Sequence, residues 1–365
     1  MHKIAIVVVG PSAEMVSGSL LRPANIYHSL KDIRNLTVKY IPVGKFAYFL
    51  FYLPLISRTE VRVIIISGVN PWISAIVAFW GSILKKNIIV DFHGFAWLEA
   101  SITESVKWPM KVLLLITEKI SYRLSHYITV ASKWLFNTLD YYFGNRGNIY
   151  VVENSVPCLF ERAVNVLIKA YRDTGALRAY VCKKVLRVLS CDDKLLLVAP
   201  LPAVFKSNVL AFEELLKVGR APGGNALIVV TGIKGSASGL RNVIATGYLS
   251  YVDYVALLLS SDGVILPYPS RAICGGARNK VLEAGFCGKP VFSTKAGVMH
   301  MEALPNIHYV ALERESVIER LKKGAIKEIS VKLNELVKEH YSFVRFKQKF
   351  LRLLATVINE LNSSS

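Results

Sequence analysis

The residues whose types and spacing are best suited to chemistry lie between positions 262 and 294. Residues 263–267 and 290–294 are short apolar runs that are typical of buried parallel strands, and the segment between them predicts a helix. Gly275 and Gly276 open this predicted helix. Its first backbone N–H groups, together with the positive end of the helix dipole, favour an anion such as a diphosphate.

A carboxylate follows on the same predicted helix. Glu283 lies four residues after Asn279, so the two side chains share one face of the helix. A carboxylate accepts two hydrogen bonds, and a ribose offers two neighbouring hydroxyl groups. The spacing therefore indicates a nucleotide site, with the phosphates at the helix start and the sugar at Glu283. The alternative is an ordinary α/β helix with a solvent-facing glutamate.

The same stretch carries a family resemblance. Pro-Tyr-Pro-Ser, followed by Lys-Val-Leu-Glu-Ala-Gly-Phe-Cys-Gly-Lys-Pro-Val, resembles the donor-site signature of family 4 glycosyltransferases. The resemblance implies the α/β GT-B architecture of two facing Rossmann-like domains with parallel sheets, with Glu283 at the donor ribose and the glycines at the diphosphate. Many members have a second glutamate where this chain has Gly275. Some branches have a lysine three residues before the retained glutamate, as Lys280 is here, and we expect Lys280 to bind phosphate.

The pattern of elements divides the chain into two domains. We expect residues 1–158 to form an acceptor-side domain and residues 159–341 a donor-side domain, with the C-terminal helix 342–362 returning to the first domain. In GT-B enzymes the loop after the first strand lies over the interdomain cleft. Gly18 and Arg22 are therefore expected near the donor phosphate or the acceptor. An ordinary helix start with a solvated arginine is an equally good interpretation.

A histidine follows the fourth predicted strand, residues 87–91. His93 stands beside a glycine just past the carboxyl end of that strand, where α/β sheets bind ligands, and it matches a histidine that the resembled family has near the reacting sugar. A neutral imidazole there can hydrogen-bond a donor hydroxyl or transfer a proton. Asp91 is expected to be a structural partner. The alternative is that His93 itself is structural.

Further donor contacts are implied by the resemblance. Lys206 stands near the lysine that clamps the diphosphate, while the Gly-Arg pair of the family is replaced by Ala199 and Pro200. Gly247 and Tyr248 are expected to line the base pocket. The clamp is thus half present, which leaves open a loss of donor affinity or of catalysis.

Composition limits the partners. The 365 residues carry a net charge of +19, and the five cysteines are scattered without a metal-binding spacing, so we expect reduced thiols, no metal and a cytoplasmic protein. The longest apolar runs, residues 46–56 and 71–84, are shorter than a membrane span. A basic surface attracts phosphorylated substrates, anionic lipid headgroups or nucleic acid, and of these partners we do not expect nucleic acid.

Two further segments have a structural and a functional interpretation. Residues 45–56 combine aromatic, apolar and basic side chains, which suits an acceptor or membrane-facing segment as well as a core helix. Residues 160–189 carry a run of Lys and Arg, which we interpret as a solvated connector.

These observations predict a glycosyltransferase. It would move a sugar from a nucleotide-sugar to a glycan or lipid-linked acceptor in glycan biosynthesis. The resemblance to the family implies a reaction with retention and without metal or other cofactor, because basic residues and helix-start amides stabilise the leaving diphosphate. Two alternatives stay open. A nucleotide-sugar epimerase shares this architecture but needs acid and base carboxylates, of which the sequence shows no convincing set. A non-catalytic GT-B protein would bind anionic lipid or nucleic acid through its charge.

Overall fold

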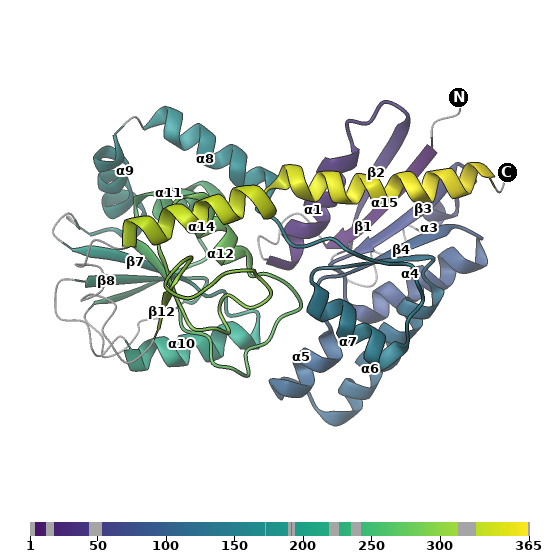
Figure 1. The fold of residues 1–365 in the computed structure, drawn as a ribbon, viewed down its shortest axis with the longest axis horizontal. Coiled ribbons are helices and arrows are strands. Elements are labelled where there is room, and N and C mark those ends of the chain that lie inside the picture. The colour runs from purple at the N-terminus through teal and green to yellow at the C-terminus, as the bar shows by residue number, and fades with distance from the viewer. Residues whose placement is uncertain are drawn as a thin grey trace. The chain divides into compact units, whose positions relative to one another are not determined.

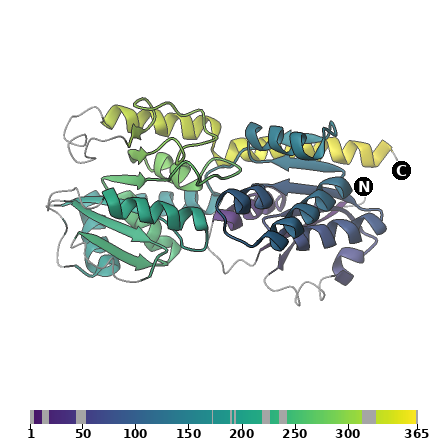
Figure 2. The ribbon, with the colours of Figure 1, turned by 90° about the horizontal axis from the view of Figure 1, so that it is seen from below.

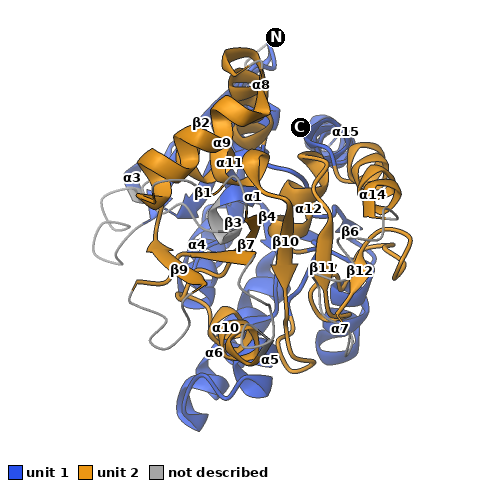
Figure 3. Ribbon diagram, turned by 90° about the vertical axis from the view of Figure 1, so that its left-hand side faces the viewer, with its two compact units in different colours: residues 1–157, 274–277, 342–365 blue, residues 158–273, 278–341 orange. Residues whose placement is uncertain are grey.

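The computed structural model describes residues 4–11, 18–43, 53–171, 173–188, 191, 194–218, 226–234, 242–312 and 326–363. The chain splits into two compact units (Figure 3). Unit 1 contains Met1–Pro157, Cys274–Ala277 and Ser342–Ser365, and unit 2 contains Cys158–Ile273 and Arg278–Tyr341.

Unit 1 is built on a parallel six-stranded sheet in the order β2-β1-β3-β4-β5-β6. The strands are β1 (Ile4–Pro11), β2 (Leu36–Val43), β3 (Val61–Ser67), β4 (Asn87–Phe92), β5 (Tyr127–Val130) and β6 (Ile149–Val151). Strands β1, β3 and β4 are runs of Ile and Val whose side chains are buried on both faces, as a sheet covered by helices on two sides requires.

Helices cover both faces of this sheet. One face packs against α1 (Gly18–Leu30) and α15 (Phe343–Ser363), the long yellow helix in Figure 1. The other face packs against α3 (Leu53–Ser57), α4 (Pro71–Ile83), α5 (Ala96–Ile102), α6 (Trp108–Leu124) and α7 (Lys133–Phe143). The last helix presents an apolar stripe to the sheet, since Phe346, Phe350 and Val357 are buried against it.

Unit 2 repeats the plan with a parallel sheet in the order β12-β11-β10-β7-β8-β9. Its strands are β7 (Leu195–Pro200), β8 (Ala226–Thr231), β9 (Val243–Gly247), β10 (Gly263–Leu266), β11 (Val291–Ser293) and β12 (Val310–Ala311). Its helices are α8 (Cys158–Ala170), α9 (Thr174–Tyr180), η1 (Val181–Leu186), α10 (Lys206–Val218), α11 (Tyr251–Ser260), α12 (Asn279–Phe286) and α14 (Ile326–His340). Helix α10 covers one face, and α11 and α12 cover the other (Figure 3).

The prediction of reduced cysteines is wrong for two of the five. Cys182 in η1 and Cys191 before β7 form a disulfide, whereas Cys158, Cys274 and Cys287 are free thiols. The bonded pair is only nine positions apart, and the turn after η1 brings the two Cα atoms to 6.0 Å, within the range that a disulfide needs.

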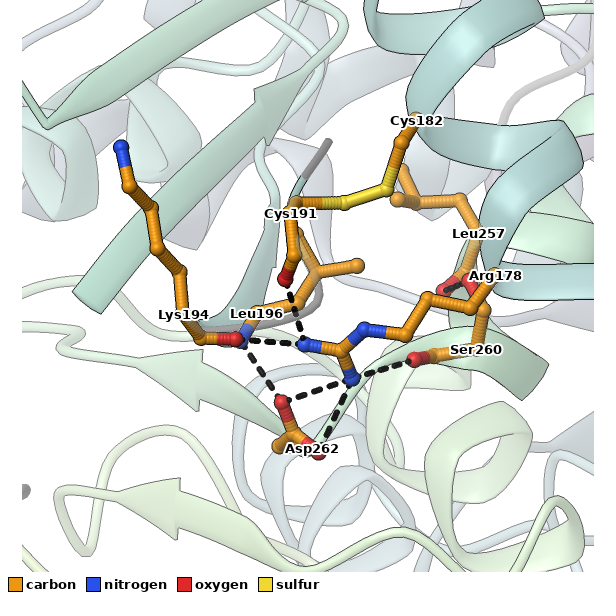
Figure 4. Close-up of a disulfide and its surroundings, with 8 residues drawn as sticks. All are labelled: Arg178, Cys182, Cys191, Lys194, Leu196, Leu257, Ser260 and Asp262. Carbon is orange, nitrogen blue, oxygen red and sulfur yellow. Dashed lines mark hydrogen bonds and ion pairs between the residues drawn. A yellow bond between two sulfur atoms is a disulfide. The ribbon is translucent and has the colours of Figure 1, made fainter. Parts of the chain in front are cut away.

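The basic run 160–189 is more than a solvated connector. Arg178 of α9 forms an ion pair with Asp262 at 3.0 Å and donates to the backbone carbonyls of Ser260, Cys191 and Lys194 (Figure 4). The guanidinium thereby ties α9 to the starts of β7 and β10. A planar group with five N–H donors suits such a junction.

One predicted boundary also shifts. Helix α12 begins at Asn279, so Gly275 and Gly276 precede it and do not open it. Most of segment 45–56 lies outside the described residues. No described helix is long and apolar enough to cross a bilayer.

Candidate functional site

The sheet of unit 2 reverses its winding between β7 and β10. The connection after β7 runs through α10 to β8 on one side, and the connection after β10 runs through α12 to β11 on the other (Figure 3). The N-termini of α10 and α12 therefore diverge from the carboxyl ends of two adjacent strands. Open parallel sheets bind their ligands at such a switch point, where two helix dipoles present their positive ends.

A polar network occupies this switch point. The Nζ of Lys280 on α12 donates to the Oδ1 of Asn208 at 2.7 Å and to the Oη of Tyr268 at 2.6 Å. The Tyr268 hydroxyl donates to the same Asn208 oxygen at 2.6 Å, and the Asn208 amide donates to the carbonyl of Pro202. Asn208 of α10 and Tyr268 after β10 thus hold the Lys280 ammonium group of α12 in place.

Two more cations lie on these elements. Arg278, the residue before α12, is buried with its guanidinium 3.7 Å from the ring centre of Tyr268, and it donates to the carbonyls of Ala272 and Ala296. Lys206 is the first residue of α10, and its side chain is exposed. Cations beside two helix N-termini make this edge of the sheet attractive to an anion.

Glu283 lies one turn into α12 and is buried, with 4% of the residue exposed. The hydroxyl of Tyr254 on α11 donates to its Oε2 at 2.7 Å. The hydroxyl of Tyr251 on α11 is also buried and has no hydrogen-bond partner among the residues that the structure describes. The ring of Phe160 on α8 packs against the rings of both tyrosines.

The environment of Glu283 changes its protonation. Burial raises the pKa of the Glu283 carboxyl from 4.5 to about 7, although the hydrogen bond from Tyr254 and the charge of Lys280 oppose this rise. Burial and the nearby carboxylate in turn raise the pKa of Tyr254 well above its ordinary value. Burial makes the ionisation of the Glu283 carboxyl group cost free energy. Titratable groups with shifted pKa values are enriched at functional sites.

The two residues predicted for the base pocket lie at the end of β9. Gly247 has φ of +70°, and its backbone N–H donates to the carbonyl of Ile233 at 2.8 Å. Its carbonyl accepts from the N–H of Gly232, and the chain of Lys234 packs against its Cα. Tyr248 follows with 52% of the residue exposed. This turn lies at the carboxyl edge of the same sheet.

In unit 1, the Arg22 side chain forms its contacts with other residues of the protein. Its guanidinium is buried and donates to both carboxylate oxygens of Asp91, at 2.7 and 2.8 Å, and to Asn154. Ser67 and Thr129 also donate to Asp91. Burial alone raises the pKa of Asp91, but the Arg22 charge and these hydrogen bonds outweigh it and hold that pKa below its usual value. Gly18 is the first residue of α1.

His93 follows Asp91 at the end of β4, as the sequence places it. It is half-buried, and its Nδ1 has no hydrogen-bond partner among the described residues. Burial lowers the pKa of His93, the charge of Arg22 lowers it further, and the charge of Asp91 opposes both. This lowering favours the neutral imidazole, the state in which it can accept as well as donate a hydrogen bond.

The two glycines expected at the diphosphate belong to unit 1, as part of Cys274–Ala277. The carbonyl of Gly275 accepts from the Ser132 hydroxyl, which also caps α7. A Cβ on Gly275 would lie 2.4 Å from the Cα of Gly94. A glutamate therefore does not fit at this position without movement of the backbone.

The sequence interpretation missed Asn208, Tyr268, Arg278 and Tyr254. Tyr268 and Arg278 lie inside the 262–294 stretch, where a tyrosine after a strand and an arginine before a helix were visible signals. Asn208 and Tyr254 gave no such signal, since each acts through a contact with a residue 29 or more positions away. The described residues contain no group of three or more His, Cys, Asp or Glu that could hold a metal.

Comparison with known proteins supports the fold. No protein-family model matches the sequence, and no curated protein matches it. HepE from Anabaena, solved with UDP-glucose, is 13% identical, with 96% of this chain and 99% of that chain covered and a TM-score of 0.68. Sucrose-phosphate synthase from Thermosynechococcus elongatus is 11% identical over both whole chains, with a TM-score of 0.69.

A third similar structure belongs to another class of enzyme. The UDP-GlcNAc 2-epimerase from Neisseria meningitidis, solved with UDP-GlcNAc, is 11% identical, with 96% of this chain and 100% of that chain covered and a TM-score of 0.57. At such identities the likeness concerns the fold. The GT-B fold class predicted from the sequence is confirmed, with two parallel six-stranded sheets.

Proposed function

We propose that the protein is a glycosyltransferase that takes its sugar from a nucleotide-sugar. The observation that carries the proposal is the arrangement on α12, where Lys280 and the buried Glu283 follow a strand at the switch point of a GT-B sheet. The ammonium of Lys280 is an appropriate partner for a diphosphate, and the Glu283 carboxylate is one for two ribose hydroxyls. HepE, which shares the fold, was solved with UDP-glucose and with UDP.

The finer assignment is to family 4, with retention and without metal or other cofactor. Lys280, Lys206 and the N-termini of α10 and α12 would stabilise the charge that develops on the leaving diphosphate. Asn279, Gly247 and Tyr248 would contact the donor, and His93 the reacting sugar. The proposed acceptor is a glycan or a lipid-linked glycan that the cytoplasmic protein meets at an anionic membrane surface, as one step of glycan biosynthesis.

Donor binding gives the first test. Titration calorimetry with UDP, GDP and ADP is expected to show one ligand whose affinity falls about 10- to 100-fold in Lys280→Ala, the loss of a charged hydrogen bond. Lys217→Ala is the matched control, because Lys217 is an exposed lysine near the far end of α10. Equal affinities in both variants would show that Lys280 does not bind the diphosphate.

Turnover separates the enzyme classes. A panel of nucleotide-sugars is incubated with and without oligosaccharide acceptors, and the products are separated by chromatography. A glycosyltransferase releases nucleoside diphosphate in proportion to the acceptor. Conversion of the nucleotide-sugar into an isomer without acceptor would establish an epimerase. Salt-sensitive binding of polyanions without any nucleotide binding would establish a non-catalytic protein.

A further inference from the structure

An apolar surface on unit 1 takes no part in the proposed donor site. Helices α4 and α6 lie side by side on the same face of the sheet (Figure 1). Each residue of one set of large apolar side chains is between 39% and 56% exposed. We call this set the α4–α6 face, and it consists of Trp72, Phe79, Ile83, Leu113, Ile116 and Ile120.

The sequence periodicity explains why these side chains form one exposed stripe on each helix. On α4 they fall at spacings of seven and four residues, and on α6 at spacings of three and four, so each set forms one stripe along its helix. The opposite stripe of α4, with Ile73, Val77 and Ala78, packs into the core. Helix α4 contains no charged residue and is thus apolar both towards the sheet and towards solvent.

Such a helix is unusual at a protein surface. An amphipathic helix presents charged or polar residues to water, and a helix that is apolar all round is normally covered. Contiguous exposed apolar surface on a soluble domain marks an interaction site. Trp108, at the start of α6, adds a side chain that is 74% exposed.

The exposed charges of the two helices are positive, while the segment between them also carries one exposed acid, Glu104. Lys85 follows α4, Lys107 precedes α6, and Lys119 and Arg123 lie on α6, and all four are exposed. The only acid on either helix is Glu118, which is buried and accepts hydrogen bonds from the backbone N–H groups that begin α5. The exposed charges of the two helices are therefore all positive, and they complement an anionic partner.

We infer that the α4–α6 face binds the surface of an anionic lipid bilayer, with its apolar side chains among the acyl chains and its lysines and arginine at the headgroups. Interfacial helices combine aromatic and aliphatic side chains with Lys and Arg in this way. A second copy of this chain fits less well, because it would bring like charges together. This inference extends the proposed function, and its test does not depend on donor binding.

The test uses the full chain and two kinds of vesicle. We expect the protein to sediment with vesicles of phosphatidylcholine mixed with phosphatidylglycerol, and to bind phosphatidylcholine alone at least tenfold more weakly. The double variant Phe79→Glu with Ile116→Glu is expected to lower the affinity for the mixed vesicles about tenfold or more, since each side chain loses its apolar burial. Both side chains are at least half exposed, so folding is preserved.

The matched control is the double variant Val166→Glu with Val344→Glu. These valines are 64% and 58% exposed, Val166 on α8 of unit 2 and Val344 on α15, which covers the other face of the unit 1 sheet, and the change in net charge is the same. Equal loss of binding in both double variants would overturn the inference, as would a wild type that binds no vesicles. A wild-type dimer in sedimentation equilibrium that only the face variant loses would assign the face to a second copy instead.

Discussion

Replacing Glu283 by glutamine is expected to stabilise unit 2 at alkaline pH while it weakens nucleotide binding. Glutamine keeps an oxygen that accepts the hydrogen bond from Tyr254, now made to the Glu283 carboxylate at 2.7 Å, and it carries no charge. The variant therefore tests whether the protein retains a costly buried carboxylate for the sake of a ligand.

The magnitude follows from the pKa of the Glu283 carboxyl. Burial raises this pKa from 4.5 to about 7, so the folded chain binds more protons than the unfolded chain between these values. The contribution of this carboxyl to stability is complete below pH 4.5 and is lost as the pH rises through about 7. Well above pH 7 the loss approaches about 3 kcal/mol, which glutamine does not suffer.

Thermal unfolding measured from pH 5 to pH 9 provides the assay. At pH 5 the wild type and Glu283→Gln are expected to unfold at similar temperatures. At pH 9 the variant is expected to be more stable by roughly 2 to 4 °C for each kcal/mol in a unit of this size. Glu214→Gln is the control, because Glu214 lies at the surface of α10 and pairs with Lys217.

Two results would refute this reasoning. If Glu283→Gln is less stable than the wild type at pH 9, the ionised carboxylate is stabilised by partners that outweigh its burial. If the variant binds the nucleotide as tightly as the wild type, Glu283 takes no part in the donor site. Because ribose hydroxyls favour the ionised carboxylate, wild-type affinity is also expected to fall as the pH drops below 7.

Three further changes test unit 1 and the disulfide. Arg22→Ala leaves the Asp91 carboxylate buried without its counter-charge and is expected to destabilise the protein by about 3 to 5 kcal/mol in urea titrations; a loss below 1 kcal/mol would show that water replaces the guanidinium. Gly275→Ala places a methyl group against backbone and is expected to cost about 1 to 3 kcal/mol, and an unchanged unfolding temperature would contradict the close approach. Reduction of the Cys182–Cys191 bond is expected to cost about 2 to 3 kcal/mol, and a protein with both cysteines replaced by serine should not respond to reductant.

The order of strands and helices was predictable because it depends on local patterns. Runs such as residues 61–67 and 87–92 are long enough, apolar enough and rich enough in β-branched residues to specify buried strands without any knowledge of their neighbours. The apolar stripe of the last helix is equally visible in its residue spacing. An error occurred at the boundary near Gly275, because the start of a helix depends on contacts outside it.

The candidate site was predictable only in part. Lys280 and Glu283 stand out because they lie three positions apart on one predicted helix, a spacing that the sequence shows directly. Asn208, which holds Lys280, lies 72 positions away, and its role exists only because β7 and β10 are adjacent in the sheet. The same holds for Arg22. From the sequence, its partner could be a ligand or solvent, and in the folded protein its partner is Asp91.

The sequence by itself thus determined the α/β class, the succession of elements and the helix that carries the candidate donor residues, because hydrophobic periodicity and turn residues act over a few positions. The tertiary structure decided which side chains meet, which carboxylates are buried, that Cys182 and Cys191 bond, and that α4 and α6 expose apolar stripes together. These features depend on strand order and helix packing, in which residues far apart in the chain become neighbours, and no local pattern encodes that proximity.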